Sequence, residues 1–288
     1  MNKVFIIIGP TGSGKSAFAT DHATKNNGII INSDAFQVYK EISICTSCPS
    51  SKDKASLEHL LYNYTSAYED YSVANWLEDA KESINYAISK NKLPILVGGS
   101  AMYIYLLING IDDTPKVSPE IKCAAKKDFE DLGIEKIYSK LLEIDKKIET
   151  KINKNDTQRI MRFYEVYLAT GKNLWDFYEN NSDKIKSNTG IKNSYEIEMH
   201  KILPEREILY EKCDKRILEF MKNGAMDEAR SLYPETHNLN KSAKKIILLR
   251  ELFDYLDGKI SLDDTISLAQ KSTRNYAKRQ YTWFRNKF

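Results

Sequence analysis

The chain has 288 residues, a formal net charge of +3 and 42% hydrophobic residues. These totals suit one large globular domain, or a core domain carrying a smaller one, and they exclude a chain too polar to bury a core. No apolar stretch approaches the ~20 residues that a membrane helix needs, so we expect a cytoplasmic protein without a membrane span. Four cysteines form no disulfide framework, and the Cys45/Cys48 pair lacks the second pair typical of a zinc site.

The first third of the chain alternates strand and helix patterns. Continuous apolar runs at Val4–Ile8 and Leu93–Val97 are typical of strands buried on both faces of a parallel sheet, and Gly28–Asn32 predicts another strand. A helix is expected from Lys15 to Lys25. A second helix is expected within Tyr71–Ser89, where apolar residues recur at three- and four-residue steps. This alternation predicts right-handed crossovers and a doubly wound α/β sheet.

The rest of the chain has mainly helical patterns. Asp112–Pro119 has two prolines and no periodicity, which indicates a linker, and Asn180–Asn193 is polar and predicts a mobile loop. Glu196–Leu203 predicts one returning strand. The segments expected to be helical are Pro119 to about Glu179, Glu205–Asn223, Ala225–Leu232, Ala243–Leu256 and Leu262–Asn286. The expected organisation is a core of residues 1–115 and 188–288, interrupted by a helical insertion domain of residues 116–187.

A phosphate-binding motif lies between the first predicted strand and the first predicted helix, as a P-loop does. Its glycines let the backbone curl so that successive N–H groups point at phosphate oxygens, and the positive end of the helix adds attraction. Lys15 supplies a charge for the terminal phosphate, and the Ser16 hydroxyl can hold Mg²⁺. The predicted phosphate site consists of Gly9, Pro10, Thr11, Gly12, Ser13, Gly14, Lys15 and Ser16. The core is therefore predicted to be P-loop NTPase-like.

Two other predicted strands end in polar groups beside this loop. Asp34 follows the Gly28–Asn32 strand, so it can hold magnesium, take a proton from an acceptor or serve as a turn residue. The Leu93–Val97 strand ends in Gly98-Gly99-Ser100, which offers backbone amides and a hydroxyl but no carboxylate for a metal. That difference argues against ATP hydrolysis.

Further motifs follow in order along the chain. They are Asp34-Ala35-Phe36-Gln37-Val38-Tyr39, Leu96-Val97-Gly98-Gly99-Ser100-Ala101-Met102-Tyr103, Asn155-Asp156-Thr157-Gln158-Arg159-Ile160-Met161-Arg162, Glu165-Val166-Tyr167, Thr170-Gly171-Lys172, Thr273-Arg274, Ala277-Lys278-Arg279-Gln280 and Thr282-Trp283. With the P-loop, they resemble the motifs of the tRNA dimethylallyltransferases over nearly the whole chain. The chain departs from the family pattern at Ala35-Phe36 (usually Ser-Met), Ser100 (usually Thr), Ile44–Pro49 and Ile246–Leu249.

This resemblance implies a tRNA-modifying prenyltransferase. The family moves a dimethylallyl group from dimethylallyl diphosphate to N6 of adenosine 37, giving N6-dimethylallyladenosine and diphosphate. Asp34 is then the general base, the P-loop holds the diphosphate with Mg²⁺ on Ser16, and Arg216 and Ser100 complete the catalytic set. The residues implied to contact the anticodon stem-loop are Asp34, Ala35, Phe36, Gln37, Ser100, Lys122, Gln158, Arg159, Ile160, Met161 and Arg162.

These residues suit the chemistry of the reaction. The N6 amine of adenine is a weak nucleophile, and a carboxylate that accepts its proton typically contributes ~10²–10⁴-fold. The leaving diphosphate needs fixed donors, which the P-loop amides, Lys15, Mg²⁺ and Arg216 can supply. The acceptor base must be flipped out of its stack to reach Asp34. Phe36 and Tyr39 can line the site of the allyl group or belong to the core.

Two basic helices predict contacts with RNA. Arg159 and Arg162 lie three residues apart in the first turns of a helix, where they can face RNA or pair with acids such as Glu165. The last helix carries a predicted basic stripe with an aromatic residue in it: Arg274, Lys278, Tyr281 and Arg285. Such a stripe can track an RNA backbone, and a solvated helix surface is the alternative.

Three rival functions fit parts of the pattern. A P-loop small-molecule kinase leaves the basic last helix and the insertion without a role. An adenylate isopentenyltransferase uses the same Asp34 chemistry on a free nucleotide but does not need the Arg159/Arg162 helix. A non-enzymatic RNA-binding protein does not need intact Lys15 and Ser16. We therefore expect a monomeric enzyme whose partners are dimethylallyl diphosphate and tRNA.

Overall fold

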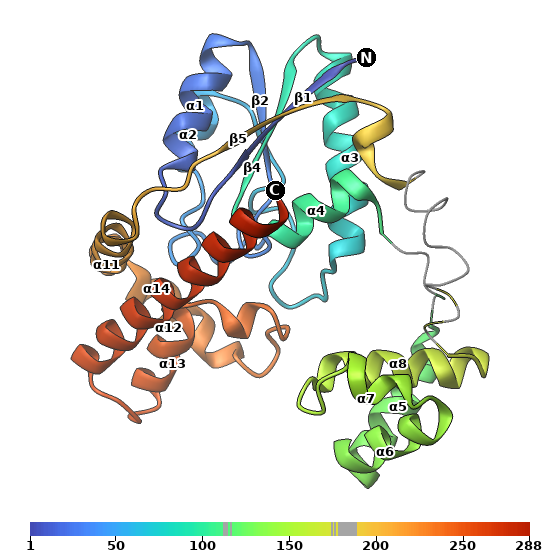
Figure 1. Cartoon of the computed structure of the whole chain (residues 1–288). Helices are drawn as coiled ribbons and strands as arrows, with labels where there is room; N and C mark the ends of the chain where they lie inside the picture. The colour runs from blue at the N-terminus through green and yellow to red at the C-terminus, as the bar shows by residue number, and fades with distance from the viewer. Residues whose placement is uncertain (112–114, 116, 174, 176, 178–188) are drawn as a thin grey trace. The chain divides into compact units, whose positions relative to one another are not determined.

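The structure is a computed structural model, and it divides the chain into two compact units (Figure 1). One unit comprises Met1–Ile108 and Ile191–Phe288, and the other comprises Asn109–Gly190. The residues described are 1–111, 115, 117–173, 175, 177 and 189–288. Most of the predicted loop Asn180–Asn193 and half of the predicted linker Asp112–Pro119 lie outside the described residues. Within the described residues, none of the helices combines the length and apolar character of a bilayer-spanning segment.

A five-stranded parallel sheet lies at the centre of the larger unit. Its strands run in the order β3-β2-β4-β1-β5, and every pairing between neighbours is parallel. They are β1 (Lys3–Ile8), β2 (Gly28–Asn32), β3 (His59–Leu60), β4 (Leu93–Gly98) and β5 (Glu196–Lys201). The predicted parallel sheet is confirmed. The two-residue β3 is too short to give a sequence pattern.

Helices cover both faces of this sheet (Figure 1). α1 (Lys15–Lys25) packs against β1, β2 and β4, and α3 (Val73–Ser89) packs against β2 and β4 from the opposite face. Across the sheet, the connection through α1 runs from β1 towards β2, and the connection through α3 runs back towards β4. Because both crossovers are right-handed, these opposite directions put α1 and α3 on opposite faces of the sheet. β1 is consequently buried from Val4 to Ile8. The predicted doubly wound α/β fold is confirmed.

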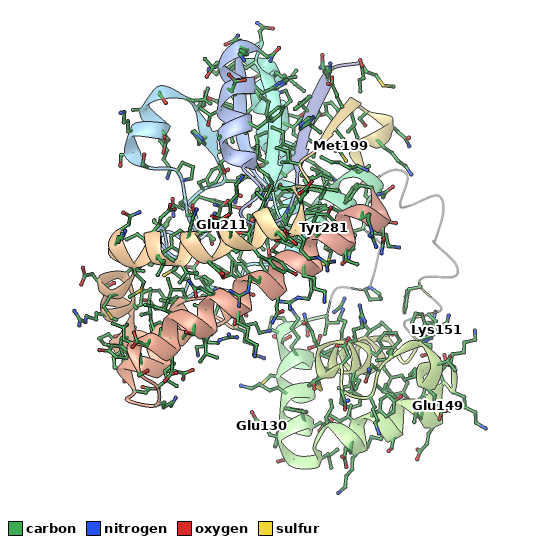
Figure 2. All side chains as sticks on the ribbon, turned by 60° about the vertical axis from the view of Figure 1, so that its left-hand side comes forward. Glu130, Glu149, Lys151, Met199, Glu211 and Tyr281 are labelled. Atoms are coloured by element: carbon green, nitrogen blue, oxygen red, sulfur yellow. The ribbon has the colours of Figure 1, made fainter. Side chains whose placement is uncertain are left out.

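Further helices surround the end of the sheet where β1 runs into the P-loop. They are α2 (Ser51–Ser56), α4 (Ala101–Asn109), α11 (Arg206–Lys222), α12 (Ala225–Leu232), α13 (Leu249–Leu256) and α14 (Leu262–Lys287). α11 and α14 pack along each other, with Tyr281 of α14 against Leu209 and Cys213 of α11 (Figure 2). Residues far apart in sequence thus meet at the carboxyl ends of β1, β2 and β4.

The predicted helix Ala243–Leu256 was wrong in its middle. A short 3₁₀ turn covers Ala243–Lys245, and α13 begins only at Leu249. Between them Leu248 has φ 74°, a strained conformation for a residue with a side chain. Its N–H donates to Oε2 of Glu251 at 2.8 Å, and its side chain is fully buried. That hydrogen bond and that burial offset the strain, and neither leaves a mark in the periodicity.

The smaller unit has its own hydrophobic core. Its described helices are α5 (Pro119–Leu132), α6 (Ile134–Ile144), α7 (Lys147–Lys151) and α8 (Thr157–Thr170). Buried residues from all four helices form the core, among them Ala125, Ile137, Ile148 and Ile160. Asp156 caps the N-terminus of α8, and its Oδ1 accepts the backbone N–H of Arg159 at 3.1 Å. This unit is slightly wider than the expected insertion of residues 116–187.

Candidate active site

The P-loop adopts the curled backbone that its glycines allow. Gly12 and Gly14 have φ values of 77° and 91°, which residues with side chains rarely adopt. α1 begins at Lys15 without a side-chain cap, so its first backbone N–H groups remain available to an anion. The Lys15 ammonium donates to the carbonyl of Pro10 at 2.9 Å, which folds the side chain back over the loop.

Hydrogen bonds fix the turn that carries Asp34. Asn32, at the end of β2, accepts the Asp34 N–H at 2.8 Å and donates to the Asp34 carbonyl at 3.0 Å. The Asp34 carboxylate accepts the Phe36 N–H at 3.0 Å, and the Ala35 N–H donates to Oγ of Ser100 at 2.9 Å. Ser100 is therefore placed to hold the Asp34 turn against the end of β4.

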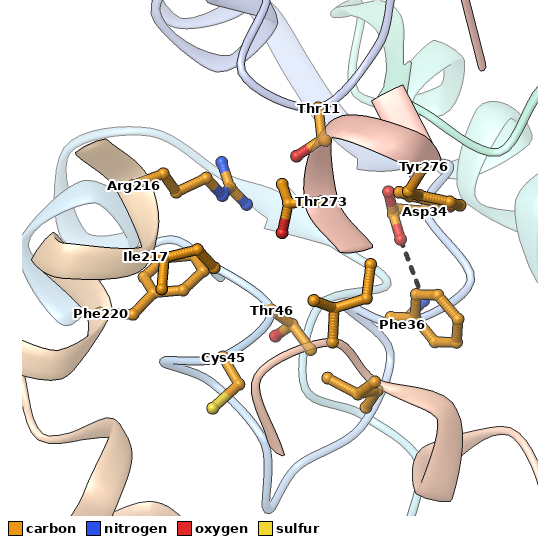
Figure 3. A pocket seen from close by; sticks show the side chains of 12 residues that line it. Thr11, Asp34, Phe36, Cys45, Thr46, Arg216, Ile217, Phe220, Thr273 and Tyr276 are labelled. Atoms are coloured by element: carbon orange, nitrogen blue, oxygen red, sulfur yellow. Dashed lines mark hydrogen bonds between the residues drawn. The ribbon is translucent and has the colours of Figure 1, made fainter. Parts of the chain in front are cut away.

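One pocket brings together Asp34 and Arg216, two of the three predicted catalytic residues, whereas Ser100 does not line it (Figure 3). Its polar side is formed by Asp34, Arg216 and Thr11 of the P-loop. Its apolar side consists of Phe36, Ile217, Phe220, Ile246 and Ile247. Tyr39, the other predicted wall residue, is instead buried in the core with 1% of its surface exposed. The arrangement offers a carboxylate, a fixed cation and an apolar wall to one ligand.

Arg216 contributes its charge to this pocket from α11. Its guanidinium lies over the Phe220 ring, with Cζ 4.8 Å from the ring centroid. Burial lowers the pKa of Arg216, and the Asp34 carboxylate opposes that shift. No carboxylate among the described residues forms an ion pair with Arg216. The cation is therefore held by stacking and remains available to an anionic ligand.

Lys15 titrates unusually low for a lysine. Burial lowers the pKa of Lys15 to about 8, the Asp34 carboxylate acts in the opposite direction, and Arg216 lowers it further. Both cations thus lie in the same half-buried region, where loss of hydration disfavours their charged forms and the Asp34 carboxylate opposes that effect. A bound anion would stabilise both charges.

The low pKa of Lys15 predicts a pH-dependent affinity for phosphate-bearing ligands. The protonated form attracts the anion, so affinity for inorganic diphosphate should be fully present below about pH 8. Above that pH it should fall by up to about tenfold per pH unit. Calorimetric titration between about pH 6.5 and 9.5 measures this dependence. Lys15→Met is the control. Its diphosphate affinity should not fall as Lys15 deprotonates, so the only pH dependence left should come from titration of the diphosphate itself. An identical pH profile in both proteins would contradict the assignment.

Ser16 lies on a neighbouring pocket rather than on the pocket of Asp34. The second pocket is lined by Ser16, Gln37, Asp53 and Tyr62, among others. Within the described parts of the chain, no group of three or more His, Cys, Asp and Glu residues could hold a metal ion. Mg²⁺ in phosphate sites commonly takes one or two protein ligands together with phosphate oxygens and waters. The exposed Ser16 hydroxyl fits that single-ligand role.

The loop between the two pockets is held by a carboxylate that the sequence analysis missed. Glu228 of α12 accepts the backbone N–H groups of Ser43, Ile44 and Cys45 at 2.6–2.9 Å. The amide nitrogen of Gln37 donates to the carbonyls of the same loop, to Thr46 O at 3.1 Å and Ser47 O at 2.8 Å. The donor group of Gln37 is thus used within the chain, and a base contact by Gln37 would rely on its oxygen.

The four residues of the predicted α14 stripe have different surroundings. Arg274 forms an ion pair with Asp214 of α11, and Tyr281 packs against α11. Lys278 and Arg285 are exposed. Lys278 lines a shallow hollow on α14 with Arg279 and Trp283. The exposed basic residues of this region therefore include Arg279, which was not part of the predicted stripe, as well as Lys278 and Arg285, which were.

In the smaller unit, both arginines of α8 have acidic neighbours. Arg159 is exposed and lies 3.1 Å from Asp156, and Arg162 lies 3.7 Å from Glu165. Arg162 also donates to the carbonyl of Pro115 at 3.1 Å. An exposed ion pair such as that of Arg159 is weak and can be exchanged for a phosphate contact, whereas Arg162 is half-buried.

The other residues implied to contact RNA differ in exposure. Lys122 and Gln158 are exposed, and Met161 is half-buried against the core of the smaller unit. Ile160 is fully buried in that core. Its side chain therefore supports α8 and offers no surface to RNA, which corrects the prediction for this residue.

Three residues of α14 reach the active site, although the sequence analysis gave them no role. Thr273 and Tyr276 line the pocket of Asp34, and Gln280 donates to the carbonyl of Gly99 at 2.9 Å. Burial raises the pKa of Tyr276, and the Asp34 carboxylate raises it further. Steps of three and four residues put them on one helix face. The sequence could have predicted their shared position, because Thr273, Tyr276 and Gln280 recur at three- and four-residue steps within the stretch that resembles the family.

Comparison with known proteins identifies the family. The model of the IPP transferase family matches residues 37–287. The tRNA dimethylallyltransferase of Rickettsia felis is 39% identical over 283 residues, covering 98% of this chain and 90% of the relative. That of Ehrlichia canis is 39% identical over 288 residues, covering 100% and 93%.

Solved structures agree with these relatives. A eukaryotic dimethylallyltransferase, solved in the course of acting on tRNA, matches with a TM-score of 0.81 and 28% identity, covering 98% of this chain and 70% of that one. The tRNA isopentenylpyrophosphate transferase of Bacillus halodurans matches with a TM-score of 0.69 and 28% identity, covering 100% and 88%. Since both the sequence matches and the fold extend over nearly its whole length, the chain belongs to the IPP transferase family.

Proposed function

We propose that this protein transfers a dimethylallyl group from dimethylallyl diphosphate to N6 of adenosine 37 in the anticodon loop of a tRNA. One observation carries the proposal: Asp34, Arg216 and the P-loop meet in a single pocket that also has an apolar wall. The products are N6-dimethylallyladenosine and diphosphate. The names of the relatives support the same reaction.

The residues at the pocket suit each part of the transfer. The amine nitrogen forms a bond to C1 of the allyl group as the bond from C1 to the diphosphate oxygen breaks. Asp34 accepts the proton that the amine loses. Lys15, Arg216 and the P-loop amides stabilise the charge that develops on the leaving diphosphate. Mg²⁺, held by Ser16, would supply further positive charge to the diphosphate when bound.

The apolar wall has two roles in this mechanism. Phe36, Ile246 and Ile247 can pack against the five-carbon tail and hold C1 in line with the acceptor nitrogen. They also exclude water, which would otherwise compete with adenosine for the activated allyl carbon. The substituted positions Phe36 and Ile246–Ile247 remain apolar, so both roles are retained.

A direct assay tests the proposed reaction. The protein is incubated with dimethylallyl diphosphate, Mg²⁺ and unmodified tRNA, and nucleosides from the digested tRNA are analysed by mass. We expect a five-carbon mass gain on one adenosine. Prenylation of free AMP in place of tRNA would indicate an adenylate isopentenyltransferase. Steady ADP formation from ATP on addition of a small acceptor would indicate a kinase.

Salt dependence tests whether the exposed cations of α14 bind the RNA backbone. Lys278 and Arg285 are both exposed. If each neutralises one phosphate, the Lys278→Ala/Arg285→Ala variant should flatten the slope of log affinity against log salt by about 1.4–1.8 units. The measurement is tRNA binding over a salt series.

A matched variant controls for the loss of two charges. Lys25 is the last residue of α1 and Lys90 is the C-cap of α3. Both helices lead into parallel strands, so both lysines lie at the amino ends of the strands, away from the P-loop. Lys25→Ala/Lys90→Ala should leave the slope unchanged. Equal slopes for all three proteins would mean that Lys278 and Arg285 belong to a solvated surface and that RNA binds elsewhere.

A further inference from the structure

Gln280 is a buried polar residue of α14 that the proposed mechanism does not use. Only 5% of its surface is exposed, and both ends of its amide contact loops of the active site. Oε1 accepts the backbone N–H of Thr11 in the P-loop at 2.8 Å, and Nε2 donates to the carbonyl of Gly99 at 2.9 Å. One side chain therefore joins the C-terminal helix to the loops that follow β1 and β4.

The backbone at Gly99 leaves room for this contact. A Cβ at this position would lie 2.4 Å from Nε2 of Gln280 and 3.3 Å from Oδ2 of Asp34. The Gln280 amide and the Asp34 carboxylate thus approach the same bare face of Gly99. The next residue, Ser100, accepts the N–H of Ala35. The loop that Gln280 holds is consequently the loop that holds the Asp34 turn.

The other end of the Gln280 amide fixes the phosphate-binding loop. Thr11 is the P-loop residue that shares a pocket with Asp34 and Arg216. Because its N–H is bound by Gln280, the position of the loop relative to Asp34 depends on α14. Buried amide groups are costly to leave unpaired, so both hydrogen bonds favour one arrangement of the three elements.

The same stretch of α14 presents cations on its outer side. Lys278 and Arg279 precede Gln280 directly, and they line a surface hollow with Trp283. An RNA bound there would restrain α14, and Gln280 would transmit that restraint to the P-loop. Coupling of this kind is reciprocal, so a bound diphosphate would restrain α14 in turn.

We propose that Gln280 is a positioning residue that ties α14 to the diphosphate cradle and to the Asp34 turn, so that occupation of either substrate site favours occupation of the other. The inference rests on the proposed function for the identity of the two ligands. Without the amide, the P-loop, the Gly99 loop and α14 adjust independently, and each ligand orders only its own part of the site.

The first test uses inorganic diphosphate with Mg²⁺ and no RNA. Gln280→Met keeps the length of the side chain and removes both hydrogen bonds. We expect it to weaken diphosphate binding by about tenfold, because two buried partners are lost. Gln270→Met is the matched control, since Gln270 lies on the same helix and its amide donates to Asp214 O of α11 at 3.2 Å. Its diphosphate affinity should stay within about twofold of wild type.

The second test measures coupling between the two sites. The affinity for an unmodified anticodon stem-loop RNA is determined with and without saturating diphosphate. Wild type and Gln270→Met should bind the RNA at least about fivefold more tightly when diphosphate is present. In Gln280→Met that factor should fall below about two, with RNA affinity in the absence of diphosphate unchanged. In turnover with saturating dimethylallyl diphosphate, kcat should fall and KM for RNA should rise by about the coupling factor that is lost, roughly two- to fivefold.

Several outcomes would overturn the proposal. They are a coupling factor near one in the wild type, a wild-type coupling factor in Gln280→Met, and an equal loss in Gln270→Met. If Gln280→Met does not fold, Gln280→Glu serves for the coupling test, because it keeps an oxygen for the Thr11 N–H and loses the donor to Gly99. Since it also adds a negative charge near Asp34, its diphosphate affinity alone is not compared with that of the wild type. Failure of the proposed function is distinguishable, since the diphosphate test needs no RNA and no prenyl transfer.

Discussion

Replacing Asp34 with asparagine should lower prenyl transfer by at least about 10²-fold. The amide has the shape of the carboxylate, and its oxygen can still accept the Phe36 N–H that fixes the turn. What the variant loses is the ability to accept a proton from the N6 amine. Affinity for tRNA should therefore stay within a few-fold, and the loss should fall on kcat. Single-turnover prenylation of tRNA with saturating dimethylallyl diphosphate measures it.

The control for this variant is Asp254→Asn. Asp254 lies on α13 and pairs with Lys259, away from the pocket, so turnover should be unchanged. If Asp34→Asn retains more than about a tenth of wild-type turnover, Asp34 is not the general base. Loss of tRNA affinity in parallel with turnover would instead assign Asp34 to binding of the RNA.

The fold was largely predictable because its signals are local. β1, β2 and β4 are continuous apolar runs, and such runs occur where both faces of a parallel sheet are covered. α1 and β2 have the predicted bounds, Lys15–Lys25 and Gly28–Asn32. The P-loop glycines, a buried strand and a following helix form one contiguous signal. The order of the strands was not predicted, since it depends on contacts far apart in sequence.

What the sequence could not show are the contacts between distant segments. Gln280 reaches Thr11 across 269 positions, and Glu228 reaches Ser43 across 185. No local pattern encodes either pair. The surroundings of the basic stripe of α14 were not predictable for the same reason, because periodicity places Arg274 on a helix face without showing that it pairs with Asp214 of α11. Ile160 is different, because Phe163 and Tyr164 follow it at three and four residues, and that periodicity already indicates a core-facing position.

Replacing Arg216 with methionine should lower kcat/KM for dimethylallyl diphosphate by about 10²–10³-fold. Methionine preserves packing against the Phe220 ring but removes the guanidinium from the pocket of Asp34. Charge on the diphosphate grows as the bond to C1 breaks, so a fixed cation stabilises the transition state more than the bound substrate. The loss should thus appear in kcat as well as in diphosphate affinity, while tRNA affinity measured without diphosphate stays unchanged.

Two further variants separate charge from geometry at this position. Arg216→Lys restores a cation but not the planar group that stacks on Phe220, so it should recover activity only in part. Arg206→Met makes the same substitution at an exposed position at the start of α11 and should leave kcat/KM unchanged. Arg216→Met with kcat/KM within about threefold of wild type would mean that Lys15 and Mg²⁺ suffice for the leaving group. Full recovery in Arg216→Lys would show that charge alone is needed and that the stack on Phe220 only shapes the pocket.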